Sequence, residues 1–468
     1  MAETRRSLSG WGRADRRSAR VQAPGPHDDL RQALLSLPGP VTVRGAGRSY
    51  GDAALPEMDG GSVLDLTRRD AVLDFDRRTG VVVVQSGTSL AALQDLGLPH
   101  GWSVPVMPGT AAVTVGGAVA SDVHGKNQPG AGTFGRHVQW LDLMCGEGDS
   151  RRLSPEGSRE DDPEGFWATV GGMGLTGVID VVALQLTRVG SDLMWHRRSR
   201  TADLASTMWL MDSVAGRQSI EPLLHNVAWI DASVEGPALG RAVVDTYRHA
   251  DAGDLPHRRS LRQNGSSRLG RDVRALPGAG VVSRLSVRAG AGAHWHTAGR
   301  SRETLVAVRR GLTPMDAAPW WPAAFGLEGL VQYQLGLPLT GSDQIEVILR
   351  LLLRLGVPPA LAVLKRFTDG ALAPLAFAVE GWSLALDFPR RWPLLEPALR
   401  AVDGIVADHG GRVYLTKDSR LPAHAMSRMY PLLESWRTDR DRLDPSRRMT
   451  SSLGARVGLV DSARHTMA

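Results

Sequence analysis

Lysine is the residue that this sequence most clearly lacks. Of the 55 basic residues among 468, three are lysines and the other 52 are arginines. The two residues serve equally well on a solvated face, so a chain biased against lysine should keep it mainly where a guanidinium fails. Such positions need a compact cation or one whose pKa can shift. Lys126, Lys365 and Lys417 are therefore candidate functional residues.

Cysteine and long apolar runs are scarce as well. A single cysteine, Cys145, excludes an intramolecular disulfide and any cysteine-rich metal site. The most apolar stretch, residues 345–364, is interrupted by arginine, glycine and proline, so we expect no transmembrane helix. Arg5 and Arg6 are not followed by the apolar core of an export signal. We expect a cytoplasmic protein, or one at the inner face of the membrane.

The patterns of metal and nucleic-acid sites are also missing. His294 and His296 have no acidic or cysteine partners at ligand spacing, so we expect no metal site. The net charge of +6 raises nucleic acid as a partner, but the arginines are scattered among comparable numbers of acids. We interpret them as a solvated surface and expect no nucleic-acid partner. Salt-sensitive retention on DNA would favour that alternative.

Short β-branched runs and glycine-rich segments organise the N-terminal half. We expect a helix after Thr88, where leucines recur at helical spacing up to Gly97, and loops at 104–136 and 165–179. From about residue 190 arginine and tryptophan become more frequent and glycine motifs rarer, which predicts a second domain. Within it we expect a helix that starts after Ser342 and stops at Gly356, and a surface loop at 250–303. Strands are expected at 41–44, 63–66, 72–75 and 81–85.

The first glycine motif is VRGAGRSYGD, residues 43–52. Its glycines at 45, 47 and 51 miss the dinucleotide fingerprint by one residue, so they predict no Rossmann helix. A loop of this kind still brings backbone N–H groups close to a pyrophosphate, because no Cβ blocks the approach. A plain turn explains this motif alone equally well.

The second glycine-rich region comprises residues 108–127 and 166–177. Few charges interrupt its glycines, while His124, Lys126 and Asn127 cluster at one tip. Ordinary turns of a sheet require no polar cluster there, so we expect these segments to bind a large anionic ligand. The glycines are Gly109, Gly116, Gly117, Gly125, Gly171, Gly172, Gly174 and Gly177.

Taken in order, the motifs resemble a known family. They are GWGR (10–13), RGAGRSYGD (44–52), TVGGAVASDVHGKN (114–127), FWATVGGMGLTG (166–177), LVQYQL (330–335), VLKRF (363–367), GWSLALDFP (381–389) and RVYLTKDSR (412–420). With them the sequence resembles the decaprenylphosphoryl-β-D-ribose 2′-oxidase family of actinobacteria, FAD oxidoreductases of the vanillyl-alcohol-oxidase type. The resemblance runs over nearly the whole chain and is weakest at 190–330.

The resemblance implies an α+β fold. A two-part FAD-binding domain of the vanillyl-alcohol-oxidase (PCMH) type would comprise residues 1–188 and 403–468, and a substrate-binding domain at 189–402 would contain an antiparallel sheet with helices. Arg48 occupies the position of the histidine that binds flavin covalently in many relatives, so we expect non-covalent FAD. The implied FAD-lining residues are Val43, Arg44, Gly45, Ala46, Gly47, Arg48, Ser49, Tyr50, Gly51, Asp52, Ala53, Gly109, Thr114, Val115, Gly116, Gly117, Ser121, Asp122, Val123, His124, Ile179 and Tyr414.

The implied reaction is oxidation of the 2′-hydroxyl of a polyprenylphosphoryl-β-D-ribose to the 2′-keto sugar. A hydride leaves the carbon for FAD while the hydroxyl proton leaves to a base. We assign that base to Lys417, because a desolvated ammonium has a lowered pKa and a guanidinium does not. Tyr50 and His124 complete the expected catalytic set. Expected substrate contacts are Lys126, Gln332, Gln334, Lys365, Ser383, Ala385 and Lys417.

The resemblance also implies partners and two departures. The partners are a short-chain reductase that completes an epimerisation toward cell-wall arabinan, a quinone or other electron acceptor, and a membrane contacted peripherally. Ser383 and Ala385 stand where the family often has asparagine and cysteine. Ala385 predicts resistance to inhibitors that attack that cysteine, and Ser383 leaves the sugar specificity open. Trp320 and Trp321 are expected either to be buried in the core or to form an exposed patch that contacts the lipid tail.

Two alternatives remain from the sequence. The first is an oxidase of the same superfamily that acts on a soluble sugar, alditol or aldonolactone. The second is a flavin-binding paralogue without catalysis.

Overall fold

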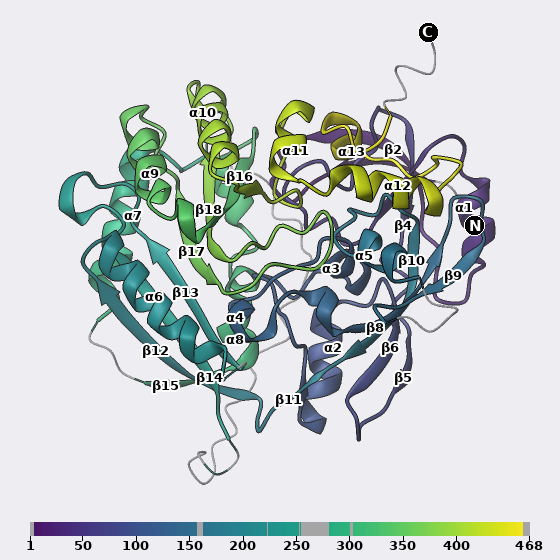
Figure 1. Ribbon diagram of the computed structural model, residues 1–468, viewed down its shortest axis with the longest axis horizontal. Coiled ribbons are helices and arrows are strands. Elements are labelled where there is room, and N and C mark those ends of the chain that lie inside the picture. Colours follow the sequence, from purple (N-terminus) through teal and green to yellow (C-terminus); the bar gives the residue numbers. More distant parts are fainter. Residues whose placement is uncertain are drawn as a thin grey trace.

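A computed structural model describes residues 4–156, 162–221, 223–251, 253, 280–299 and 303–461. Two lobes lie side by side, one formed by the N-terminal part of the chain and the other by its middle part (Figure 1). The C-terminal helices return to the first lobe. None of the helices in the described ranges has the length and apolar character needed to cross a membrane.

The first lobe contains two sheets and a short ladder. The expected strands at 41–44, 72–75 and 81–85 are confirmed, and the one expected at 63–66 begins two residues earlier. The four-stranded sheet has the order β1 (Thr4–Ser9), β2 (Arg16–Gln22), β4 (Gly61–Asp65), β3 (Val41–Arg44). The five-stranded sheet has the order β5 (Val72–Phe75), β6 (Val81–Gln85), β10 (Val178–Gln185), β8 (Val138–Met144), β9 (Ser150–Leu153). The ladder pairs β7 (Trp102–Ser103) with β11 (Thr187–Arg188).

Short helices interrupt the glycine-rich segments that the sequence predicted as loops. In α3, Thr114 is the N-cap and its hydroxyl accepts from Gly117 N at 3.2 Å, which fixes the turn where the glycines begin. The helix expected after Thr88 is confirmed, with Ser89 as its N-cap. The helices of this lobe are α1 (Leu30–Ser36), α2 (Leu90–Gly97), α3 (Val115–Ala120), α4 (Gln128–Ala131) and α5 (Pro163–Thr169).

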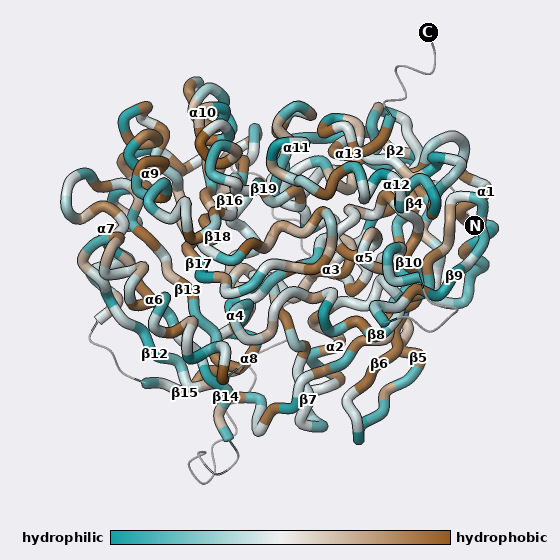
Figure 2. Tube along the Cα trace, viewed as in Figure 1, coloured by the Kyte–Doolittle hydropathy of each residue, from teal (hydrophilic) through white to brown (hydrophobic). Residues whose placement is uncertain are grey.

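The second lobe is an antiparallel sheet covered by helices on one face. The predicted helix after Ser342 is confirmed, its buried residues include Ile345, Ile348 and Leu352, and hydrophilic residues alternate with hydrophobic ones along it (Figure 2). The helices are α6 (Leu204–Gln218), α9 (Gln344–Arg354) and α10 (Leu395–Asp408). The sheet order is β15 (Thr304–Ala307), β12 (Leu193–Thr201), β14 (Ala242–His249), β13 (Leu224–Ile230), β17 (Leu361–Phe367), β18 (Gly381–Pro389), β16 (Leu330–Pro338), β19 (Arg412–Val413).

The two faces of this sheet differ in chemistry. On the covered face, Tyr333 of β16 donates to Asp403 of α10, and Arg366 of β17 pairs with Asp212 of α6. Side chains alternate between faces along a strand, so the neighbours of these residues point the other way. That other face carries Gln332, Gln334, Lys365, Ser383, Ala385 and Asp387 in register on three adjacent strands.

The region 250–303 differs from the expected surface loop. Residues 252, 254–279 and 300–302 lie outside the described residues, but α7 (Arg284–Thr297) is a helix, followed by β15 and α8 (Val308–Leu312). A capping box formed by Ser283 and Ser286 starts α7, and Val287 is the buried residue of this helix. The two glycines inside the helix weaken its propensity, so capping and packing stabilise it instead.

The C-terminal segment is attached to the first lobe by the Arg456–Asp52 ion pair and a hydrogen bond from Trp436, while Arg456 also pairs with Asp418 of the same segment. Arg456 donates to Asp52 at 2.7 Å and to Asp418 at 2.8 Å, and Trp436 donates to Ala168 O at 2.9 Å. The predicted domain boundary between residues 402 and 403 falls inside α10, which packs on β16. The C-terminal helices are α11 (Ala423–Met429), α12 (Leu433–Leu443) and α13 (Ser452–Arg456).

Candidate active site

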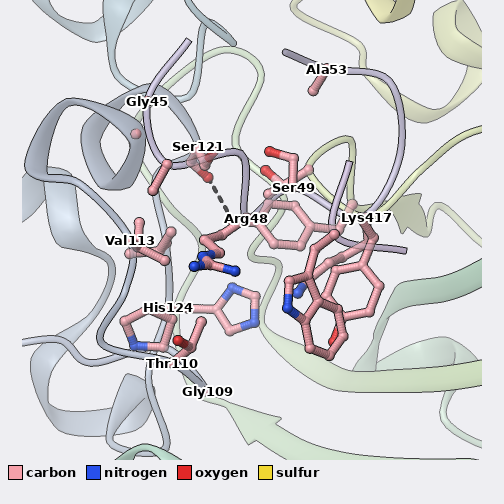
Figure 3. A pocket seen from close by; sticks show the side chains of 18 of the residues that line it. Gly45, Arg48, Ser49, Ala53, Gly109, Thr110, Val113, Ser121, His124 and Lys417 are labelled. Atoms are coloured by element: carbon pink, nitrogen blue, oxygen red, sulfur yellow. Dashed lines mark hydrogen bonds between the residues drawn. The ribbon is translucent and has the colours of Figure 1, made fainter. Parts of the chain in front are cut away.

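The main cavity lies between the glycine-rich loops of the first lobe and the polar face of the second-lobe sheet. Arg48, His124 and Lys417 direct their side chains into it (Figure 3). The predicted residues that line it are Val43, Gly45, Ala46, Gly47, Arg48, Ser49, Tyr50, Ala53, Gly109, Thr114, Gly116, Gly117, Ser121, Val123, His124, Lys126, Ile179, Gln332, Gln334, Lys365, Ser383, Ala385, Tyr414 and Lys417.

The first-lobe wall is a close-packed backbone surface. A Cβ at Gly45 would lie 2.3 Å from the Thr114 hydroxyl oxygen, so only glycine fits against the cap of α3. Gly47 has a φ of +62°, in the left-handed region. Both requirements keep these two positions free of side chains, which leaves the backbone there open to a ligand.

Three polar side chains on the same wall have buried atoms without a hydrogen-bond partner among the residues that the structure describes. These atoms are Arg48 Nε, Ser86 Oγ and His124 Nδ1. Buried polar groups are normally hydrogen-bonded, so an unpaired set beside a cavity indicates a missing ligand. A bare glycine surface with a guanidinium and further hydrogen-bonding groups fits the phosphates and polar ring of FAD.

Five predicted FAD contacts lie outside the cavity lining. Their structural contacts explain the positions: the Arg44 guanidinium donates to Ala54 O and Ser9 O, and Val115 is fully buried in the core. Asp122 accepts from Gly135 N, and burial raises its pKa to about 6. The other two, Gly51 and Asp52, pack against the C-terminal segment at Asp418 and Arg456.

The second-lobe wall presents an amide and a hydroxyl beside the histidine. The Gln334 amide nitrogen donates to Ser383 Oγ at 2.9 Å and lies 3.0 Å from His124 Nε2. Burial, together with the charges of Lys365 and Lys417, lowers the pKa of His124 well below its usual value. His124 is therefore a neutral ring whose Nδ1 remains available to a ligand.

Lys417 lies against an aromatic pair. Its Nζ is 3.9 Å from the centroid of the Tyr50 ring, and Tyr50 packs on Trp11 at 4.7 Å. Burial lowers the pKa of Lys417 to about 7, with Lys365 adding to this effect and Asp387 opposing it. Burial also raises the pKa of Tyr50 well above its usual value, so the phenol keeps its proton.

Asp387 holds a lining residue of the cavity, Gln332, and the sequence reasoning missed it. It accepts from Gln332 at 2.5 Å and from the Trp321 indole at 2.7 Å, and burial raises its pKa. Its position two residues after Ala385 on a strand with a polar face was the available signal. Trp321 is thus half-buried and holds Asp387 by a hydrogen bond, whereas the side chain of Trp320 is 50% exposed.

The other two lysines differ in how they are held. Lys126 Nζ donates to Gly311 O at 2.5 Å and to Leu312 O at 3.2 Å, and burial with the Lys365 charge lowers its pKa to about 7. Lys365 has no hydrogen-bond acceptor within the part of the chain that the structure describes, and burial lowers its pKa to about 8. Lys365 is therefore a cation of the cavity wall that no described acceptor engages.

Further lining residues carried no sequence signal that distinguished them from core. Trp229 of β13 and Leu361 of β17 belong to the sheet wall, whereas Pro314 and Met315 come from the segment after α8. Trp229 also donates through its indole to Asp245 at 3.1 Å. Apolar residues of this kind can be recognised as cavity-lining residues only when the pairing of the strands is known.

The fold and this cavity define a class of enzyme. The family of FAD binding domains matches residues 19–154, which include the first glycine loop and α3. With a glycine wall for the cofactor and a titratable wall opposite, the protein is an FAD-dependent oxidoreductase of the PCMH type.

Relatives define the family more narrowly. The chain is 32% identical to the decaprenylphosphoryl-beta-D-ribose oxidase of Mycolicibacterium smegmatis over 98% of each chain. It is 34% identical to an uncharacterised protein of Streptomyces coelicolor over 79% of this chain and 100% of that one. It is 25% identical to the L-gulono-1,4-lactone dehydrogenase of Mycobacterium tuberculosis over 89% of this chain and 90% of that one. The chain belongs to the decaprenylphosphoryl-β-D-ribose oxidase family.

Proposed function

We propose that this protein oxidises the 2′-hydroxyl of a polyprenylphosphoryl-β-D-ribose to the 2′-keto sugar, with FAD as the hydride acceptor. The single observation that carries the proposal is the buried lysine in the cavity, Lys417, placed against Tyr50 of the first glycine motif. The near full-length relative whose name includes that sugar supports the choice of substrate.

Lys417 is suited to accept the hydroxyl proton. With a pKa of about 7, about half of its side chains are neutral at neutral pH. The neutral amine takes the proton of the substrate hydroxyl as the C2–H bond breaks, and bound FAD supplies the acceptor for the hydride. The neighbouring phenol of Tyr50 keeps its own proton and serves as a hydrogen-bond donor to the sugar.

Three further side chains are proposed to position the substrate. Gln334 and Ser383 present an amide and a hydroxyl that match the hydroxyl groups of a sugar. Lys365, unengaged by other residues in the described ranges, is the proposed counter-ion of the substrate phosphate. Lys126 is held by two carbonyls, so we assign it to shaping the wall instead.

The proposed reaction implies partners by its chemistry. The keto sugar needs a carbonyl reductase to become the epimeric alcohol, which a short-chain reductase would supply. The reduced flavin needs an acceptor such as a quinone, and the lipid tail brings the enzyme to a membrane surface. Because Arg48 stands at the position of covalent attachment in many relatives, FAD should be released intact when the protein is denatured in acid.

Anaerobic bleaching of the flavin tests the proposal. Polyprenylphosphoryl-β-D-ribose should reduce the bound FAD, while L-gulono-1,4-lactone and free alditols should leave it oxidised. Bleaching by the lactone or an alditol but not by the lipid sugar would overturn the substrate assignment. FAD that binds but is reduced by none of them would overturn catalysis altogether.

A further inference from the structure

A second cavity adjoins the active site on the same side of the sheet. It lies beneath α7, between this helix and strands β12, β13, β14 and β15. Trp229, Pro314 and Leu361 line both cavities, so the two share a wall and are neighbours in space. The region that the sequence predicted as a surface loop thus supplies the cover of a binding space through Ala291 and Trp295.

Strand register places both cavities on one continuous face. Val363 pairs with Ala385 on one side and with Trp229 on the other, which carries the polar face of β18 across β17 to β13. Asp245 pairs with Val227, two residues before Trp229, and with Arg198 on the next strand. The floor therefore runs without interruption from the lysine cluster to the second cavity.

The charged groups of the second cavity largely satisfy one another. Asp245 accepts from His196 at 2.8 Å, from Arg198 at 2.7 Å and from the Trp229 indole at 3.1 Å. Asp231 accepts from Arg241 at 2.8 Å in the same way. A ligand is therefore not needed to neutralise these carboxylates, and a charged ligand gains little from them.

The remaining lining is mainly apolar. Half-buried or buried side chains form it: Trp295, Leu305, Val306, Pro359, Ala360 and Leu361. Arg310 stands exposed at the rim, and its guanidinium has no hydrogen-bonded or ion-paired partner among the residues described. A mainly apolar cavity that opens beside the proposed sugar site matches the apolar chain of a lipid-linked sugar whose phosphate is held at Lys365.

We propose that the second cavity binds the phosphate-proximal isoprene units of the lipid substrate. This inference rests on the proposed function for the sugar, but isoprenoid binding itself can be measured without turnover. The chain leaves the sugar site past Trp229 and Leu361 and lies under α7. The enzyme thereby distinguishes a lipid-linked sugar from the same sugar in free form.

A cavity-filling variant tests the inference, with a control on the same helix. Ala291 lines the second cavity, and Ala291→Trp fills it; Ala293 is exposed and lies outside the lining, so Ala293→Trp is the control. The probe is farnesyl phosphate, titrated calorimetrically into the FAD-loaded enzyme. We expect Ala291→Trp to weaken binding at least about tenfold, because each excluded isoprene unit removes several buried methylenes. The control should bind like the wild type.

A second assay separates this inference from the proposed function. Flavin reduction is compared for farnesylphosphoryl-β-D-ribose and for ribose 1-phosphate; Ala291→Trp should lose the preference for the lipid form while leaving the tail-less sugar unaffected. Equal farnesyl phosphate affinity in both variants, or equal loss for both sugars, overturns the inference. If no ribose compound reduces the flavin but Ala291→Trp still abolishes farnesyl phosphate binding, the proposed function fails and the lipid site stands. Leu305→Gln on β15 gives the same readouts should the tryptophan variant fail to fold.

Discussion

Replacing Lys417 by methionine removes the proposed base and keeps an unbranched side chain over the Tyr50 ring. A lysine with its ordinary pKa of about 10.5 would be neutral in roughly 0.03% of molecules at pH 7, against about half at the pKa of about 7 given by burial. The cavity thus raises the population of the base on the order of a thousandfold. General bases contribute about 10²- to 10⁴-fold to rate, and Lys417→Met should slow flavin reduction by a factor in that range.

The sign of the pH dependence follows from the active form. Because Lys417 acts as the neutral amine, wild-type flavin reduction should rise as pH increases through about 7 and then level off. Lys417→Met should bind FAD normally and show no such rise. Stopped-flow bleaching under anaerobic conditions gives both quantities. A variant rate within about threefold of wild type, or a flat wild-type profile between about pH 5.5 and 8.5, would refute the assignment.

Three further predictions address the neighbours of this lysine, the cavity and the domain assembly. Asp387 raises the pKa of Lys417, so Asp387→Asn should move the midpoint of the pH profile to lower pH; a midpoint that stays or rises contradicts the coupling. Ala385 lines the cavity and the lone cysteine is buried elsewhere, so a thiol-alkylating reagent should inactivate Ala385→Cys, with protection by substrate, and spare the wild type; equal inactivation of both would count against the lining. Arg456→Met leaves two buried carboxylates unpaired and should lower the free energy of unfolding by about 3 kcal/mol in urea titrations, whereas a loss under about 1 kcal/mol would show the pairs to be dispensable.

Much of the glycine-rich wall of the cavity could be expected from the sequence, because the motifs that carry the family resemblance are local. Gly45 and Gly47 are required by a close approach and a left-handed backbone, and such requirements select one residue type at fixed positions. The scarcity of lysine also predicted cavity residues, because a chain that otherwise uses arginine keeps lysine where a guanidinium cannot replace it. All three lysines line the cavity, although Lys126 is held by carbonyls and only Lys365 and Lys417 remain open to a substrate.

The opposite wall could not be assembled from local patterns. Trp229 lines the cavity, and Asp387 bonds to the lining residue Gln332, only because strands from separate parts of the sequence align their alternate residues on one face. The helix α7 was missed because Gly290 and Gly292 lower its propensity, whereas the cap at Ser283 that starts it is a weaker signal than a run of glycines and arginines. In both cases, the sheet wall of the cavity and helix α7, tertiary packing determines the structure, and local sequence patterns do not report it.

The central claim, hydride loss from C2 of the lipid-linked ribose, is tested most directly by isotope substitution. Single-turnover bleaching of the flavin is measured with polyprenylphosphoryl-β-D-ribose carrying deuterium at C2 or at C3. The account predicts slower bleaching with the C2 label alone, together with a 2′-keto product. Slowing with the C3 label instead, or bleaching that is equally fast with both labels and yields no 2′-keto sugar, would contradict it.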